Sequence, residues 1–225
     1  MGKGKLKASE ESQQVSDNET AVILDELRKI LSNRVNGDIV EFGCYKGDTS
    51  LLMEKVLERE FPTSDSRLWI YDSFEGLPDK SHEDASSAGD NFQAGELFVT
   101  KREVVERFKR AGLKVPRIRK GFFEDLDAGK IGPDGAVLQS SNDLPDKICF
   151  AFLDGDLYQS IKTSLTLVTP RMARDETGKP IGMIIVHDYN NPQLPGSARA
   201  VDEWMRQQKT APRLQRRETL AIISW

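Results

Sequence analysis

Acidic residues follow two apolar segments of the chain in a pattern that suits cation binding. Asp154 and Asp156 come directly after the apolar run that ends at Leu153, and His187-Asp188 follows a second such run. Carboxylates beside buried strands are costly unless they are solvated, paired or bound to a cation. Hard divalent cations prefer such oxygen clusters, and a bound metal lowers the pKa of a substrate hydroxyl. These residues predict a metal-assisted reaction site, with capping of the next helices as the alternative.

A glycine-rich turn is the second feature with chemical potential. Glu41 is followed by Gly43 and, after three further residues, by Gly47. Glycines let the backbone turn tightly and approach a ligand, and the N–H groups that open the next helix suit a carboxylate or phosphate. The order differs from the GxGxxG dinucleotide fingerprint and suits a ligand with both a positive group and a carboxylate. A simple glycine turn is the alternative.

The ends of two further predicted strands carry side chains that could bind a nucleoside. Asp72 ends an apolar strand, where an acid accepts hydrogen bonds from both ribose hydroxyls. NAD enzymes use the same device, so Asp72 does not choose between cofactors, and a cap or turn role is its alternative. Phe122 and Phe123 end a later strand and could face an adenine ring, although core packing is the expected role of at least one.

These side chains need a scaffold that brings distant segments together. Helical spacing from Ala21 to Leu31 predicts a helix that Asn36-Gly37 would end. Further helices are expected over residues 48–61, 96–111, 158–169 and 197–209. Strands are expected over residues 38–43, 68–72, 115–123, 147–153 and 183–186, with a final pair of short strands over 213–225. This alternation predicts a parallel sheet with helices on both faces, which binds ligands at the carboxyl ends of its strands.

Composition and length fit one soluble α/β domain. The chain has 225 residues and a net charge of −4, so we expect no attraction to nucleic acid or to an anionic membrane. Residues 1–17 are polar and are expected to form a loose or disordered tail, and residues 18–225 a single domain. No apolar run approaches the roughly 20 residues of a membrane helix, and no signal peptide is visible.

Cysteine usage points to a cytoplasmic protein. Cys44 and Cys149 lie in or next to apolar strand-like segments, and neither belongs to a CxxC pair. Reduced thiols are the simplest account, and a zinc site is not expected.

Four segments together resemble the macrocin O-methyltransferase family. They are Glu41-Phe-Gly43-Cys-Tyr-Lys-Gly47, Tyr71-Asp72-Ser-Phe74-Glu-Gly76-Leu-Pro78, Leu153-Asp154-Gly155-Asp156-Leu-Tyr158-Gln-Ser160 and His187-Asp188-Tyr189. The resemblance runs in order from about residue 20 to the C-terminus. It implies a class I, Rossmann-like methyltransferase fold with a doubly wound, mostly parallel seven-stranded sheet. It also implies S-adenosylmethionine as cofactor, a divalent metal that is usually Mg²⁺, and a sugar hydroxyl of a natural product as acceptor.

The resemblance also implies roles for individual residues. Carried onto this chain, the family pattern places Glu41, Gly43 and Asp72 at the cofactor. Together with the strand-end residues, the full set of expected cofactor contacts is Glu41, Gly43, Tyr45, Gly47, Thr49, Ser50, Asp72, Ser73, Phe74, Phe122, Phe123 and Asp154. The metal would be held by Asp154, His187 and Asp188, with Asp154 as the candidate base. His187 departs from the family pattern, which has an acid there. Because imidazole suits Mn²⁺, Fe²⁺ or Zn²⁺ better than Mg²⁺, metal identity and metal dependence stay open. A general base or a hydrogen-bonding residue are the other roles for His187.

Other functions fit parts of the sequence. An NAD-dependent oxidoreductase would use a similar sheet, but the GxGxxG fingerprint is missing. A glycosyltransferase would use Asp154-Gly155-Asp156 as a DxD motif, and a binding protein would keep the fold without chemistry. The expected partner is a small-molecule acceptor, and the chain could form a homo-oligomer. The expected pocket loops are residues 76–95 and 190–197, and their sequences contain no motif that identifies the acceptor.

Overall fold

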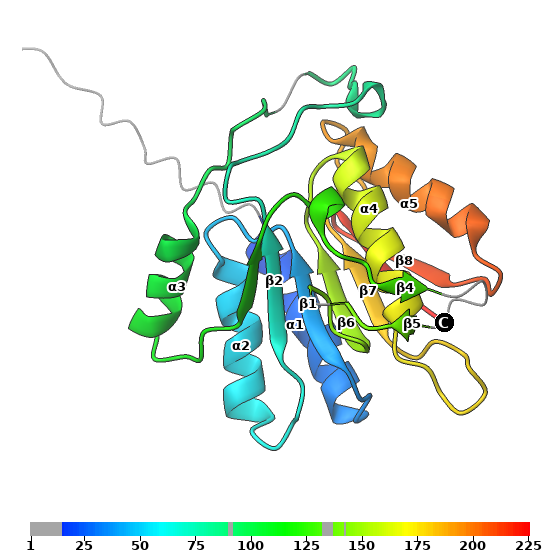
Figure 1. The fold of residues 1–225 in the computed structure, drawn as a ribbon. Coiled ribbons are helices and arrows are strands. Elements are labelled where there is room, and N and C mark those ends of the chain that lie inside the picture. Colours follow the sequence, from blue (N-terminus) through cyan, green and yellow to red (C-terminus); the bar gives the residue numbers. More distant parts are fainter. Residues whose placement is uncertain (1–14, 90–91, 132–136, 142) are drawn as a thin grey trace, which may run out of the picture.

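A seven-stranded sheet runs through the molecule in the order β3-β2-β1-β6-β7-β9-β8 (Figure 1). The computed structural model describes residues 15–89, 92–131, 137–141 and 143–225. The strands of the sheet are β1 (Asp38–Phe42), β2 (Leu68–Asp72), β3 (Arg117–Lys120), β6 (Ile148–Leu153), β7 (Met183–Val186), β8 (Arg213–Arg217) and β9 (Leu220–Ser224). The first five in sheet order run parallel, and β9 and β8 run antiparallel to their neighbours. This topology confirms the predicted doubly wound, mostly parallel sheet.

Helices cover both faces of this sheet. They are α1 (Asp17–Ser32), α2 (Asp48–Glu60), α3 (Lys101–Arg110), α4 (Tyr158–Val168) and α5 (Pro195–Gln207). The first three pack into one hydrophobic cluster and the last two into another, on opposite faces. Figure 1 shows α4 in front of the sheet and α1 behind it. Short 3-10 helices η1 (His82–Asp84), η2 (Phe123–Asp125) and η3 (Thr169–Arg171), and the strand pair β4 (Lys130–Ile131) and β5 (Val137–Gln139), lie in the connections.

The pleat of β1 decides which side chains reach which layer. Ile39 belongs to the cluster under α1 and α2, whereas Val40 and Phe42 belong to the cluster under α4 and α5. Successive residues of a strand point to opposite faces, so Glu41 falls on the α2 side. The acid that ends the strand is therefore directed at the start of α2.

Three predicted boundaries are wrong at their ends. The helix expected from residue 96 begins at Lys101, because the Thr100 side chain accepts the N–H of Glu103 in a capping box, and Leu97 has a positive φ of 59°. The strand expected over 115–123 covers only β3, and Phe123 lies in η2 instead. The last helix, α5, covers 195–207 rather than 197–209, with Pro195 at its first position.

The N-terminal boundary also moves. The first helix begins at Asp17, where Ser16 and Glu19 form a capping box, and Val15 packs against the core. Residues 15–17 therefore belong to the folded domain and not to a loose tail; the rest of the predicted tail, residues 1–14, lies outside the described residues. The helix ends at Ser32, earlier than Asn36-Gly37 suggested.

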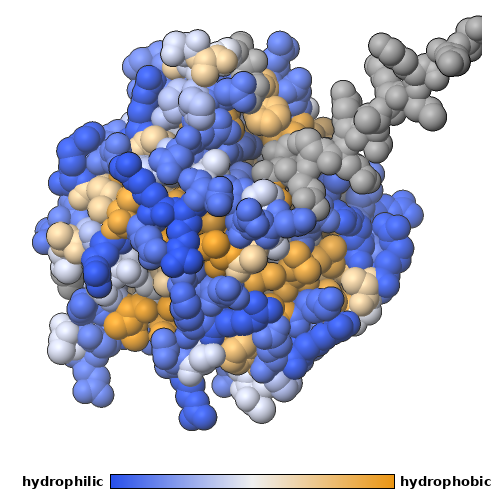
Figure 2. Space-filling view, turned by 180° about the vertical axis from the view of Figure 1, so that it is seen from behind, coloured by the Kyte–Doolittle hydropathy of each residue, from blue (hydrophilic) through white to orange (hydrophobic). Residues whose placement is uncertain are grey.

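Both cysteines are free and buried, as predicted. Burial raises the pKa of Cys149 to about 12 and that of Cys44 well above its ordinary value. Hydrophilic residues cover most of the face in Figure 2, and hydrophobic residues gather toward its centre. No helix among the described residues is long and apolar enough to cross a membrane.

We expect Gly43 to be indispensable to the meeting of β1 and β6. Its φ is 85°, and a Cβ there would overlap the carbonyl oxygen of Asp154. Gly43→Ala should therefore lower the free energy of unfolding in urea by more than Gly178→Ala. Gly178 is the matched control, because it has a φ of 82° but nothing within 4 Å of an added Cβ. The excess should be on the order of 1–3 kcal/mol, the usual cost of overpacking. Equal losses in the two variants would contradict this account.

Candidate active site

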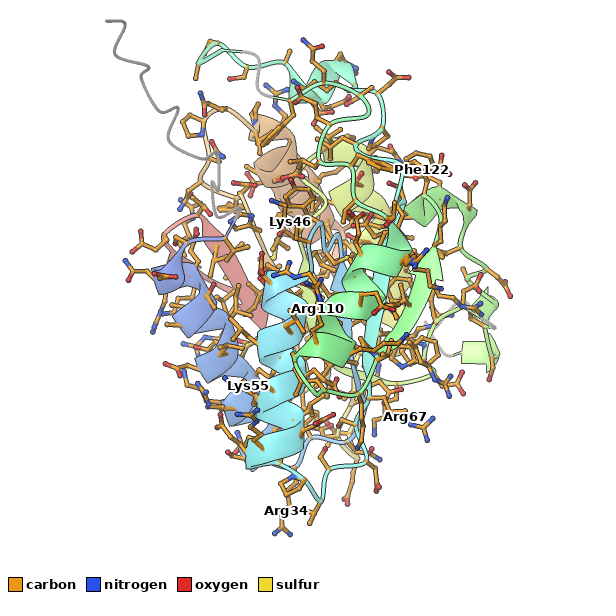
Figure 3. All side chains as sticks on the ribbon, turned by 90° about the vertical axis from the view of Figure 1, so that its left-hand side faces the viewer. Arg34, Lys46, Lys55, Arg67, Arg110 and Phe122 are labelled. Atoms are coloured by element: carbon orange, nitrogen blue, oxygen red, sulfur yellow. The ribbon has the colours of Figure 1, made fainter. Side chains whose placement is uncertain are left out.

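A cavity of about 790 Å³ opens at the carboxyl ends of β1, β2 and β6. This volume is in the range of small-molecule sites. Its lining includes most of the predicted cofactor residues: Glu41, Gly43, Tyr45, Thr49, Asp72, Ser73, Phe122, Phe123 and Asp154. The other three, Gly47, Ser50 and Phe74, are buried behind the wall. Figure 3 shows Lys46 and Phe122, which both line the cavity, toward the upper end of the sheet.

Glu41 is a buried acid with little to balance its charge. Its residue is 1% exposed, and the Ser50 hydroxyl donates a hydrogen bond to its carboxylate. Burial raises the pKa of Glu41 well above its ordinary value, and the charges of Asp154 and Asp72 add to that effect. No cationic side chain in the described parts of the chain forms an ion pair with it. The inner wall of the cavity therefore presents a carboxyl group that a ligand cation would stabilise in its ionised form.

The Asp72 carboxylate fastens the turn that follows β1. One oxygen accepts the N–H of Cys44 at 2.9 Å and that of Tyr45 at 3.2 Å, and the other accepts the N–H of Phe74 at 2.8 Å. A carboxylate has about four acceptor positions, so capacity remains on the side that lines the cavity. The turn role that the sequence left as an alternative for Asp72 is present here, together with access to the cavity.

The predicted aromatic residues divide between wall and core. Phe122 is half-buried and lines the cavity. Phe123 also lines it but packs edge-on against Phe42, with ring centroids 5.0 Å apart. Phe74 is 3% exposed and belongs to the core. Phe122 belongs to neither hydrophobic cluster, so its ring is the one of these three available to face a ligand.

Asp154, His187 and Asp188 come together, as the sequence predicted. Nδ1 of His187 lies 2.7 Å from an oxygen of Asp154 and 3.2 Å from an oxygen of Asp188. One potential ligand atom from each residue lies within 4.8 Å of the others. The parallel pairing of β6 with β7 produces this arrangement, because the N–H of His187 donates to the carbonyl of Leu153 at 2.9 Å.

Buried negative charge exceeds buried positive charge around this imidazole. Four acids, Asp154, Asp156, Asp188 and Glu19, lie near it. Burial alone would lower the pKa of His187, but the surrounding carboxylates raise it well above its ordinary value. Burial, with the charges of Asp154 and Asp188, raises the pKa of Asp156 well above its usual range. A set of acids with one imidazole among them suits a further cation, because uncompensated buried charge is costly.

Backbone strain accompanies this cluster. Asp156 has a φ of 58° and Asp188 a φ of 59°, both in the left-handed region that L-residues seldom adopt. Such strained residues gather at functional sites, where the surrounding structure holds them. The two acids are therefore fixed in orientation by the fold as well as by their hydrogen bonds.

Glu19, on the first turn of α1, also reaches this cluster, although no motif in the sequence pointed to it. It is 5% exposed, and its carboxylate lies 3.7 Å from Nε2 of His187. Burial would raise its pKa, but the neighbouring His187 and hydrogen bonds from Thr219 and Ser16 outweigh burial and hold that pKa well below the ordinary value. The spacing of Ser16 and Glu19 is a capping-box signature that would have predicted the helix start, but not the contact with His187.

The loop over residues 76–95 is anchored at its base and its far side. Across the base, the N–H of Gly95 donates to the carbonyl of Leu77, and the N–H of Leu77 donates to the carbonyl of Glu96. Buried Asp84 accepts the N–H of Tyr158 at 2.7 Å, which satisfies the start of α4. The loop contributes Gly76, Leu77 and Pro78 to the cavity, whereas the other expected pocket loop, residues 190–197, does not line it.

The features described so far are those of a class I methyltransferase. They are the sheet order, the antiparallel last strand, and a cavity built on a glycine-rich turn and strand-end acids. The fold of solved relatives agrees. The methyltransferase NovP superposes with a TM-score of 0.70 at 24% identity, covering 91% of this chain and 78% of that one. The calicheamicin methyltransferase CalS11 gives a TM-score of 0.67 at 18% identity, covering 94% and 81%.

The chain belongs to the Macrocin-O-methyltransferase (TylF) family, whose model matches residues 18–223. It is 32% identical over 165 residues to the 8-demethyl-8-(2,3-dimethoxy-alpha-L-rhamnosyl)-tetracenomycin-C 4'-O-methyltransferase of Streptomyces olivaceus, covering 71% of this chain and 56% of that protein. It is 30% identical over 182 residues to the demethyldecarbamoylnovobiocin O-methyltransferase of Streptomyces niveus, covering 78% and 60%. The match thus spans less than two thirds of either relative. The family resemblance expected from the four motifs is confirmed.

The raised pKa of Glu41 predicts a stability effect of known sign. Ionising a group whose pKa is raised in the folded state destabilises that state, so the penalty grows as pH rises from the unfolded value, about 4.3. Relative to wild type, Glu41→Gln should gain free energy of unfolding with rising pH, by up to about 1.4 kcal/mol per pH unit. Urea titrations at several pH values measure this.

Glu54 provides the control for Glu41. It lies on the same helix as Ser50, outside the cavity, and burial raises its pKa to about 7. The gain from Glu54→Gln should therefore level off near pH 7, whereas that from Glu41→Gln continues. A pH-independent difference between wild type and Glu41→Gln would show that Glu41 ionises normally.

Proposed function

We propose that this chain is an S-adenosylmethionine-dependent O-methyltransferase that acts on a hydroxyl of a sugar or another natural-product acceptor. The observation that carries the proposal is the unpaired, buried carboxyl of Glu41 beside the glycine-rich turn, in a chain of this family. The two curated relatives are named for O-methylation of a rhamnosyl-bearing tetracenomycin and of a novobiocin precursor. Natural-product acceptors of that kind are therefore the first class to test.

The cavity fits a zwitterionic sulfonium ligand. Glu41 would accept the ammonium of the methionine moiety, which supplies the counter-charge that the described residues lack. The N-cap of α2 is Gly47, which makes no side-chain cap, so the first N–H groups of that helix are open to the ligand carboxylate. Thr49 and Tyr45 line this part of the cavity. The positions of charge and donor thus match the two charged ends of the methionine group.

The nucleoside would lie toward β2 and β3. Asp72 would accept the ribose hydroxyls with the acceptor capacity that its three amide contacts leave. Ser73 lines the cavity beside it, and Phe122 offers a ring face to the adenine. This placement keeps the methyl donor near the ends of β1 and β6, where Asp154 lies.

Asp154, His187 and Asp188 fit a divalent cation. They offer two carboxylates and one imidazole in a cluster with surplus negative charge. The imidazole favours Mn²⁺ or a similar cation over Mg²⁺. When bound, such a cation lowers the pKa of an acceptor hydroxyl.

Within this cluster we assign proton removal to Asp154. Its side chain is 16% exposed and lines the cavity, whereas those of His187 and Asp188 are 5% and 8% exposed. Both nitrogens of His187 face carboxylates, so we assign it the role of a cation ligand rather than that of the base. Asp154 would take the proton of the acceptor hydroxyl while that oxygen displaces the cofactor sulfur from the methyl carbon. The products are the methyl ether and S-adenosylhomocysteine.

The same features favour methyl transfer over the other functions considered. The turn after β1 lacks the dinucleotide fingerprint, and the family match covers the Asp154-Gly155-Asp156 segment within a methyltransferase frame. A wild-type protein that S-adenosylhomocysteine stabilises against heat, and that NAD⁺ and UDP-sugars do not, would support this choice. Stabilisation by NAD⁺ or a UDP-sugar alone would contradict it.

Asp154→Asn should abolish methyl transfer while leaving cofactor affinity nearly intact. The substitution removes the proton acceptor but keeps the shape of the side chain, and the cofactor is held mainly by the ends of β1 and β2. Transfer of a labelled methyl group to glycosylated acceptors, with calorimetric titration of S-adenosylhomocysteine, measures both effects. Glu124→Gln is the control, since Glu124 lines the same cavity outside the cluster. Retained turnover in Asp154→Asn would remove Asp154 from the chemistry.

Removal of divalent cations should stop turnover, because the hydroxyl then keeps its ordinary high pKa. Mn²⁺ should restore activity at lower concentration than Mg²⁺, since His187 supplies a nitrogen ligand. Dialysis against a chelator, followed by titration of each cation, provides the measurement. Full activity after exhaustive chelation would mean that Asp154 acts without a metal.

A further inference from the structure

Glu19 reaches the site from outside every motif that defines it. It lies at the third position of α1, while His187 follows β7, far along the chain. The antiparallel strand β9 brings its own start, and Thr219 just before it, to the edge where β7 ends. The start of α1 meets this turn, so Glu19 and Thr219 lie together behind the imidazole.

Hydrogen bonds from two elements fix the Glu19 carboxylate. One oxygen accepts the N–H of Ser16 at 3.0 Å and its hydroxyl at 2.7 Å. The other accepts the N–H of Thr219 at 3.2 Å and the Thr219 hydroxyl. The carboxylate is therefore immobilised while an oxygen lies 3.7 Å from Nε2 of His187. An acid whose only task was to cap α1 would not need the contacts with Thr219.

The two nitrogens of His187 face different partners. Nδ1 faces Asp154 and Asp188, which line up with it as potential metal ligands, and Nε2 faces Glu19. A ligating imidazole binds a metal through a deprotonated nitrogen and donates its other N–H to an acceptor, which fixes its tautomer and ring orientation. The Glu19 carboxylate lies on that second side of the ring, as an ion-pair partner 3.7 Å from Nε2.

We propose that Glu19 is a positioning residue that directs Nδ1 of His187 at the cation and gives the site its preference for nitrogen-accepting cations such as Mn²⁺. This inference rests on the cation site proposed above. In this arrangement Glu19 touches neither substrate nor cofactor. It acts through His187 alone, so it would lose this role if an acid stood at position 187.

Direct binding of Mn²⁺ and of Mg²⁺ tests the role of Glu19 without any turnover. Electron paramagnetic resonance of free Mn²⁺, and calorimetry for Mg²⁺, are applied to the full chain. Glu19→Gln should weaken Mn²⁺ binding about 10- to 100-fold, the usual effect of losing such a partner. Mg²⁺ binding should change much less, so the preference for Mn²⁺ should shrink. Glutamine is itself accepted in capping boxes, so α1 keeps its start.

Two further variants separate positioning from helix capping. Ser16→Ala removes the hydroxyl that caps α1 but keeps the Ser16 N–H and the Thr219 donors on the Glu19 carboxylate, so it should lower the melting temperature but leave Mn²⁺ affinity within about twofold. His187→Asp replaces the imidazole that Glu19 addresses. In that background Glu19→Gln should no longer weaken Mn²⁺ binding, which is the non-additivity expected of residues that act on one another.

The outcomes distinguish the two levels of the proposal. No Mn²⁺ binding by the wild type would overturn the cation site, and the role of Glu19 with it. Binding by the wild type that Glu19→Gln retains would overturn only the role of Glu19. The same holds if Ser16→Ala weakens Mn²⁺ binding as much as Glu19→Gln does, because capping would then explain the effect.

Discussion

The close meeting of β1 and β6 at their carboxyl ends is the constraint on which the site depends. The N–H of Asp154 donates to the carbonyl of Phe42 at 2.8 Å, and Gly43 leaves no room there for a side chain. This is where the chain order of the sheet reverses, because β2 and β3 lie on one side of β1 and β6 and β7 on the other. At such a switch point the loops diverge and leave a crevice for a ligand. The cavity, the glycine-rich turn and the acidic cluster all open from it.

Buried acidic groups are the second feature on which the site depends. The fold buries Glu41 and Asp156 where burial raises their pKa, and it gathers further acids around His187. Ionising either group in its buried position costs free energy. Proteins retain such costly groups chiefly at functional sites, where a ligand supplies the missing counter-charge. In our proposal the cofactor ammonium and a divalent cation take these two roles.

Contacts between distant segments hold the reactive side chains in place. Asp72 ties down the turn after β1, Asp84 ties the long loop to α4, and Glu19 joins α1 to the turn before β9. Each is an acid that accepts hydrogen bonds from backbone N–H groups. Because the backbone donors are fixed by the fold, these hydrogen bonds hold the carboxylates rigidly. A site held in this way keeps its geometry before the ligand arrives, which is the condition for preorganised catalysis.

The strand and helix order, the glycine-rich turn and the grouping of Asp154, His187 and Asp188 could be predicted from the amino-acid sequence, because apolar periodicity and strand-end polarity are local patterns. A predicted boundary was wrong where helix capping sets the start of an element, as at Thr100. Three contacts became visible only in the folded chain: the hydrogen bond from Ser50 to Glu41, the three amide N–H groups on Asp72, and the approach of Glu19 to His187. These contacts join residues on separate elements, and the register of β7 against β9 sets the last of them. A pairing that arises from the packing of a whole sheet leaves no spacing in the chain for a sequence pattern to reveal.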